Sequence, residues 1–308
     1  MDLHNCFFGW HLPSEKGISL SEMEGLVRKA DAVIVLTGTG HGHGRALECE
    51  GADRPNLLLP PGHDEAIAKV LAWAPNAVIV NHSGSPMELP WISRAATLIQ
   101  YGYAGMEGGN ALAAILFGDV NPSGKLPHTC PFKLADSPAA MLGNYNGTNV
   151  VYQEGIFIGY RWYDKKAIAP MFPFGHGLSY TTFKYGKVSA SAKTLAPGGT
   201  ITTSVKVTNT GKREGKEIVQ LYVRDLAKTP KVEREVRSLK NFAKIDLKPG
   251  ESKVVTLTVK PGDLTYFDVT AKNFRANAGT YAVEIGASSR DIKGMAEFTL
   301  TDDYTEAD

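Results

Sequence analysis

Short apolar runs alternate with helical stretches from residue 20 to about residue 130. Three apolar runs rich in β-branched residues predict strands, and the first two read as strands buried on both faces: 32–37, 77–81 and 97–101. Three stretches with helical periodicity accompany them: 21–30, with Ser19 or Ser21 as N-cap, 63–73 and 108–117. Strands and helices that alternate at this spacing indicate right-handed crossovers and a parallel sheet with helices on its faces. Three strands are fewer than such domains normally have, so we expect the open edge of the sheet to need further chain.

The second half of the chain has a different period. Four segments alternate apolar and polar positions: 202–209, 217–224, 252–259 and 279–286. Turn residues separate them, at a spacing near that of a seven-stranded β-sandwich. No Cys-Trp-Cys pattern is present, which favours a fibronectin-like over an immunoglobulin-like sandwich. The stretch 131–183 between the two halves is rich in Gly, Pro and aromatic residues and reads as a packed connector.

These patterns predict an α/β plus all-β protein. We expect three parts: a partial α/β sandwich domain, parallel and three-layered, over 1–130, a connector over 131–183 and a fibronectin type III-like domain over 184–308.

Composition excludes several classes of partner. The formal net charge is +1, from 33 basic and 32 acidic residues, which gives no reason to expect nucleic acid or an acidic membrane. No apolar run approaches the roughly 20 residues that span a bilayer. The first residues do not form a secretory signal, and the compartment stays open between cytoplasmic and secreted. Cys6, Cys49 and Cys130 are too few and too scattered for a disulfide framework or a zinc site, and no cofactor is expected. Asn81 and Asn146 match the glycosylation pattern, but Asn81 ends a predicted strand and should be inaccessible.

The stretch 48–60 holds the most informative group of chemically active side chains. It carries Glu48, Glu50, Asp53 and Arg54 and follows the first predicted strand. Ligands of open α/β sheets gather at the carboxyl ends of the strands, so these residues have a plausible place to work. By composition alone, a solvated acidic loop is the simpler interpretation.

Other candidates weigh less. His41 and His43 lie in a glycine-rich loop without a carboxylate or Cys at a suitable spacing, so a solvated loop is favoured over a metal site. The same loop lacks the spacing of a dinucleotide-binding motif. His176, in Phe-Gly-His-Gly, reads as a packed turn residue rather than a base.

Four aromatic residues of the connector allow two interpretations. Tyr152, Tyr160, Trp162 and Tyr163 could line a rim on which sugars stack, or form a hydrophobic seam between domains, and the seam is favoured.

Several blocks in the same order resemble glycoside hydrolase family three, the β-glucosidase family. The run from Glu48 to Pro60 is similar to the family's Glu-Ser-Glu-Gly-x-Asp-Arg signature. Four further blocks agree with family patterns: Asn-His-Ser-Gly-Ser-Pro at 81–86, Gly-Asp-Val-Asn-Pro-Ser-Gly-Lys-Leu-Pro at 118–127, Gly-Ile-Phe-Ile-Gly-Tyr-Arg-Trp-Tyr at 155–163 and Phe-Pro-Phe-Gly-His-Gly-Leu-Ser-Tyr at 172–180. The similarity covers about residues 20–300. These sequence blocks most resemble those of fungal members of the family that carry a protective-antigen-type, lectin-like insert.

The resemblance implies a partial (α/β)6 sandwich and a retaining mechanism that removes terminal β-D-glucosyl residues. A barrel-domain Asp attacks the anomeric carbon, while Glu50 protonates the leaving oxygen and later deprotonates water. Glu48 is the runner-up; it fits better as a neighbour whose charge keeps Glu50 protonated. Asp53 and Arg54 are expected to pair with each other and brace the loop rather than to touch substrate. The implied substrate is a β-glucoside or oligosaccharide.

The chain also departs from the family. No (β/α)₈ barrel precedes the matched blocks, a fold that needs about 250 residues. A truncated gene model or fragment, inactive alone, is therefore expected, with the N-terminal barrel domain as its missing partner. Ala52 replaces an aromatic residue of the signature, which puts the rigidity of the loop in doubt. The alternative function is that of a non-catalytic module that binds carbohydrate or a partner protein. The sequence leaves open whether the substrate is a glucoside, a xyloside or a glucan, and whether the protein forms a homo-oligomer.

Overall fold

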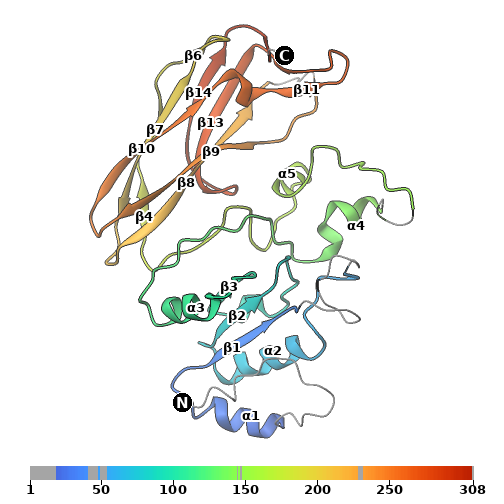
Figure 1. Ribbon diagram of the computed structural model, residues 1–308, viewed down its shortest axis with the longest axis vertical. Coiled ribbons are helices and arrows are strands. Elements are labelled where there is room, and N and C mark those ends of the chain that lie inside the picture. Colours follow the sequence, from blue (N-terminus) through green and yellow to red (C-terminus); the bar gives the residue numbers. More distant parts are fainter. Residues whose placement is uncertain are drawn as a thin grey trace. The chain divides into compact units, whose positions relative to one another are not determined.

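The computed structural model describes residues 19–40, 48, 54–143, 145, 148–227 and 232–306 (Figure 1). The chain divides into two compact units. Unit 1 comprises Met1–Leu112 and Pro131–Ser137, and unit 2 comprises Ala113–Cys130 and Pro138–Asp308. The domain boundaries expected after residues 130 and 183 stay predictions.

Unit 1 is built on a parallel sheet of three strands in the order β1-β2-β3. The strands are β1 (Ile34–Gly38), β2 (Val78–His82) and β3 (Thr97–Gln100), which lie side by side in Figure 1. Ile34 pairs with Val78, and Val78 with Thr97, so the three strands end together at one edge of the sheet. The strands and their parallel arrangement agree with the sequence prediction.

Helices accompany these strands in the expected order. They are α1 (Leu20–Val27), α2 (His63–Trp73) and α3 (Gly108–Leu116), with a short η2 (Ile92–Arg94). Ser19 is the N-cap of α1, because its hydroxyl accepts from the Glu22 amide while the Glu22 carboxylate accepts from the Ser19 amide. This capping box decides between the two predicted N-cap residues.

Burial corrects one detail of the sheet. The central strand β2 is buried, with Ile79 at 0% and Val80 at 1% exposure. The outer strand β1 was also expected to be buried on both faces, but Ile34 is 47% exposed. An edge strand has a neighbour on only one side, so its apolar composition alone does not bury it.

Unit 2 is mainly antiparallel β structure with short helices. Its helices are α4 (Pro138–Leu142), α5 (Tyr160–Lys165) and η4 (Pro261–Leu264), while η3 (Leu134–Asp136) belongs to unit 1. The strands are β4 (Phe183–Tyr185), β5 (Ser189–Ala190), β6 (Thr194–Leu195), β7 (Ile201–Asn209), β8 (Gly215–Asp225), β9 (Ser238–Leu247), β10 (Ser252–Val259), β11 (Tyr266–Asp268), β12 (Asn273–Ala276), β13 (Gly279–Ser288), β14 (Asp291–Leu300) and β15 (Tyr304–Thr305).

Two sheets of unit 2 enclose an apolar core. One sheet has the order β10-β7-β4, with β5 also paired to β7, and the other has the order β6-β14-β13-β8-β9; β11, β12 and β15 form a small third sheet. Inward residues such as Val207, Leu221 and Ile285 are at most 1% exposed. Alternate residues of β7 are buried, as its sequence pattern predicts. The fold class expected from sequence, an α/β unit followed by a β-sandwich, is confirmed.

The four aromatic residues of the connector do not form one cluster. Tyr160, Trp162 and Tyr163 of α5 are buried in unit 2, whereas Tyr152 is 71% exposed and meets Tyr145 edge-on. The three α5 residues are therefore packing residues, and Tyr152 presents its ring to solvent. His176 stacks on Phe172, and its amide donates to the Pro173 carbonyl, which agrees with the predicted turn role.

Three smaller findings concern the described residues. None of their helices is both long and apolar enough to cross a bilayer. No group of three or more potential metal-ligating side chains occurs among them. Asn81 is 0% exposed, as expected for a residue at the end of a central strand, and Cys130 is buried with a free thiol.

Candidate active site

The carboxyl ends of β1, β2 and β3 are joined by a network of polar side chains. Gly38 ends β1 with φ +140°, and a Cβ there would overlap the backbone of His82 in β2. This close approach needs glycine. Beyond the strands, the Thr39 amide donates to the His82 carbonyl and the Tyr101 amide to the Asn81 carbonyl. The loops that follow the three strands are thus held close together.

Buried amide side chains fix the loop after β2. The Asn81 amide nitrogen donates to Ser83 Oγ at 3.0 Å and to Gln100 Oε1 at 2.8 Å. Gln100 Nε2 donates back to Ser83 Oγ at 3.0 Å, and Ser83 Oγ donates to the Ser85 carbonyl at 2.9 Å. The turn at Gly84 and Ser85 is therefore tied to β3 as well as to β2.

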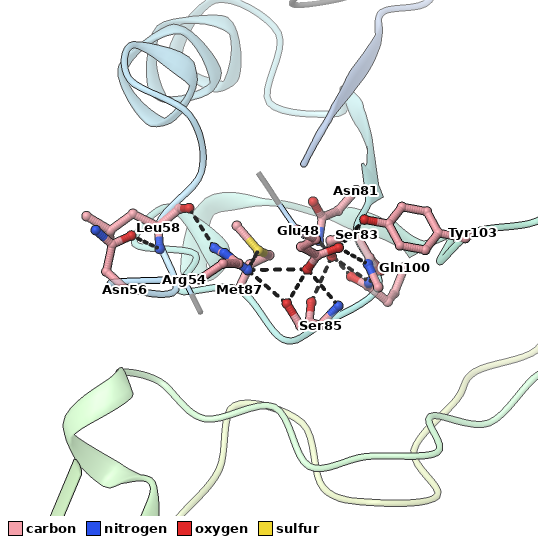
Figure 2. Close-up of polar contacts among 11 residues, drawn as sticks. Glu48, Arg54, Asn56, Leu58, Asn81, Ser83, Ser85, Met87, Gln100 and Tyr103 are labelled. Carbon is pink, nitrogen blue, oxygen red and sulfur yellow. Dashed lines mark hydrogen bonds and ion pairs between the residues drawn. The ribbon is translucent and has the colours of Figure 1, made fainter. Parts of the chain in front are cut away.

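Glu48 lies at the centre of this network (Figure 2). Its carboxylate accepts from the amide of Gly84 at 2.8 Å and from the amide of Ser85 at 2.9 Å. The hydroxyls of Ser85 and Tyr103 also donate to it, one to each oxygen. Arg54 Nη1 lies 3.4 Å from Glu48 Oε1, and the two side chains are only 10% and 14% exposed.

These contacts set the charge of Glu48. Burial by itself raises the pKa of the carboxyl group, but the hydrogen bonds from Ser85, Tyr103 and the Gly84 amide outweigh it and lower the pKa from 4.5 to about 2. Glu48 is therefore ionised at neutral and mildly acidic pH. A carboxylate that is ionised and saturated with donors serves as an anchor and cannot supply a proton.

Arg54 supports the same network from the other side. Its guanidinium donates to Ser85 Oγ at 2.8 Å and to the Leu58 carbonyl at 3.0 Å, besides its contact with Glu48. Ser85 Oγ thus accepts from Arg54 and donates to Glu48. The expected pairing of Arg54 with Asp53 stays a prediction, because Asp53 lies outside the described residues; the contacts of Arg54 with Glu48, Ser85 and Leu58 are consistent with a bracing role.

The structure brings together two of the four residues singled out in the sequence, Glu48 and Arg54. Glu50 and Asp53 lie outside the described residues, as do His41, His43 and Ala52.

Three residues at the centre of the cluster, Gly84, Ser85 and Tyr103, were not singled out. A usable signal existed, because hydroxyl and glycine residues follow β2 and β3 at the edge where Glu48 follows β1.

Comparison with known proteins supplies the family. Residues 15–180 match the glycosyl hydrolase family 3 C-terminal domain, and residues 217–289 match a fibronectin type III-like domain. The chain belongs to glycosyl hydrolase family 3. The matched ranges include Glu48, Arg54 and their partners, and they confirm the family that the sequence blocks resemble.

Relatives of this family member occur in bacteria and fungi. It is 46% identical over 255 residues to the β-glucosidase BoGH3A of Bacteroides ovatus, a match that covers 82% of this chain and 34% of the relative. It is 42% identical over 286 residues to a probable β-glucosidase I of Emericella nidulans, over 91% of this chain and 33% of the relative. The chain therefore spans about a third of the length of the curated relatives that it matches.

A solved structure of a β-glucosidase also matches nearly the whole of this chain with about a third of its own length. The β-glucosidase of Kluyveromyces marxianus in complex with glucose matches with a TM-score of 0.85 and 39% sequence identity. That match covers 95% of this chain and 35% of the Kluyveromyces enzyme. Both units of the chain thus share their folds with the corresponding third of a larger glycosidase.

Proposed function

We propose that this chain is the part of a retaining β-glucosidase that supplies the general acid/base, Glu50, to a site completed by a barrel domain. Three findings support the proposal. The chain belongs to family 3, its relatives are named β-glucosidases, and one similar structure carries glucose. The proposed substrate is a terminal β-D-glucosyl residue of a glucoside or oligosaccharide.

The observation that carries the assignment is the state of Glu48. Two glutamates lie two positions apart in the run after β1, and a general acid must hold a proton at the working pH. Glu48 does not meet this demand, because hydrogen bonds from Ser85, Tyr103, the Gly84 amide and Thr39 lower its pKa to about 2. The resemblance to the family signature gives the role to Glu50, and we propose that the negative charge of Glu48, two positions earlier in the chain, favours the protonated form of Glu50.

The proposed reaction has two steps. A carboxylate of the barrel attacks the anomeric carbon while the Glu50 carboxyl gives its proton to the departing oxygen. The Glu50 carboxylate then takes a proton from water, which releases glucose with its configuration retained. The two carboxyl groups must lie about 5–5.5 Å apart in such enzymes, so the acid/base loop needs firm support. We assign that support to Glu48 and Arg54, and propose it for Asp53.

The experiment compares the chain alone with a hybrid enzyme. In the hybrid, the 308-residue chain replaces the corresponding C-terminal third of the Bacteroides ovatus β-glucosidase. We expect no turnover of an aryl β-glucoside by the chain alone and clear turnover by the hybrid. Glu50→Ala in the hybrid should lower kcat/KM for methyl β-glucoside by about 10³-fold, because the methoxide leaving group needs a proton.

A substrate that needs no proton is the matched control. Dinitrophenolate leaves without protonation, so Glu50→Ala should spare the first step with dinitrophenyl β-glucoside. Equal losses of kcat/KM on both substrates would show that Glu50 is not the general acid. Turnover by the chain alone that survives Glu50→Ala would contradict the whole assignment.

A further inference from the structure

Glu48 joins the segments that follow all three strands at the carboxyl edge of the sheet, through its backbone amide and its carboxylate. The Glu48 amide donates to the Gly40 carbonyl, in the segment after β1. The side chain accepts from Gly84 and Ser85, after β2, and from Tyr103, after β3. Figure 2 shows Glu48 between Tyr103 and Arg54, with Ser85 below it in that view. We call Glu48, Gly84, Ser85 and Tyr103 the strand-end clamp.

The clamp leaves the carboxylate little freedom. One oxygen is held by the Gly84 amide and Tyr103, and the other by the amide and hydroxyl of Ser85. The Tyr103 ring is itself held edge-on against His82, with ring centres 5.1 Å apart. A side chain with both oxygens bound from two directions cannot rotate without losing several charge-assisted hydrogen bonds at once.

Gly84 makes room for this arrangement. A Cβ at Gly84 would lie 2.5 Å from Tyr103 Cε2 and 3.1 Å from Glu48 Oε2. Any larger residue would therefore push the phenol off the carboxylate. The contact between Tyr103 and Glu48 thus depends on the absence of a side chain at Gly84.

We propose that Tyr103 and Ser85 are positioning residues for catalysis, which fix Glu48 and through it the backbone two residues before Glu50. The proposal rests on the function proposed above. A general acid contributes fully only when its carboxyl lies within hydrogen-bond reach of the leaving oxygen. The clamp provides a fixed point at the start of the segment that carries this acid.

The first test uses the 308-residue chain as it stands. Carbon-13 labelling of glutamate carboxyls reports the Glu48 pKa by NMR, with Glu48→Gln to assign the signal. We expect a value near 2 in the unmodified chain, and a rise toward 4.5 in Tyr103→Phe, Ser85→Ala and Gly84→Ala. Tyr145→Phe is the matched control, because it removes a tyrosine–glutamate hydrogen bond to Glu154 in unit 2, and it should leave the Glu48 signal unchanged. A Glu48 signal that titrates near 4.5 in the unmodified chain would overturn the clamp.

The second test asks whether the clamp acts through the acid. In the hybrid enzyme, Tyr103→Phe and Ser85→Ala should lower kcat/KM about tenfold for methyl β-glucoside and much less for dinitrophenyl β-glucoside, because kcat/KM reports the first step, in which Glu50 acts as the acid. A purely structural role would lower both alike, by reducing the amount of folded enzyme, and would contradict the proposal.

The outcomes distinguish the proposed acid/base role of Glu50 from the proposed positioning role of Tyr103 and Ser85. If Glu50→Ala shows the leaving-group dependence and Tyr103→Phe does not, the function stands and the positioning role fails. If Glu50→Ala shows no such dependence, the proposed function fails, while the NMR titration still decides whether the clamp exists.

Discussion

The edge of the sheet in unit 1 and the sandwich core of unit 2 are stabilised in opposite ways. The core of unit 2 is apolar and continuous, with residues such as Val207, Leu221 and Leu247 at 0% exposure. At the edge of unit 1, one carboxylate collects donors from the segments after β2 and β3. Burial of apolar side chains stabilises the second unit, whereas directional polar contacts hold together the part of the first unit that we propose for catalysis.

The largest expected effect comes from the sandwich core. Leu221→Ala should destabilise unit 2 by about 3 kcal/mol, because it removes buried methyl groups and leaves a cavity. Amide hydrogen exchange should show the loss in β8 and β13, while the Glu48 carboxyl keeps its low pKa. A change of the Glu48 pKa in this variant would contradict the claim that the two regions are stabilised independently.

A smaller effect is expected at the clamp. Glu48→Gln should cost unit 1 about 2 kcal/mol, because the Gly84 and Ser85 amides lose a charged acceptor. Exchange in β2 should speed up, and exchange in β13 should not. Glu24→Gln is a suitable control, since its ion pair with Arg28 is exposed and contributes little.

Acid should weaken the same region selectively. The folded-state pKa of Glu48 lies below its ordinary value, so its stabilisation is complete above about pH 4.5 and is lost as the pH falls toward 2. Thermal unfolding followed by NMR between these pH values should show unit 1 losing stability, and Glu48→Gln should flatten that part of the profile. An equally steep profile in the variant would mean that other carboxyl groups carry the effect.

Much of the fold could be predicted from the sequence. The alternation in β7 and the apolar run of β2 report burial directly, and Ser19 followed three residues later by Glu22 predicts the start of α1. The burial of β1 could not be predicted in this way. Its residues resemble those of β2, but its place at the edge of the described sheet leaves Ile34 half exposed.

The site was predictable only in part. Glu48 and Arg54 stand out because they lie in one charged run, but Ser85 and Tyr103 are 37 and 55 residues away from Glu48. They meet it because parallel strands bring their carboxyl ends to one edge of the sheet. Which hydroxyls reach a given carboxylate depends on the register of the strands and on the space above Gly84, and the sequence pattern does not carry this information.

The most direct test of the account is azide rescue in the hybrid enzyme. With Glu50→Ala and dinitrophenyl β-glucoside, the glucosyl-enzyme forms but lacks a base, and azide attacks it without needing one. We predict that azide restores turnover and yields β-glucosyl azide, whereas azide has no such effect with Glu48→Ala. Rescue by azide in Glu48→Ala and none in Glu50→Ala would contradict the account.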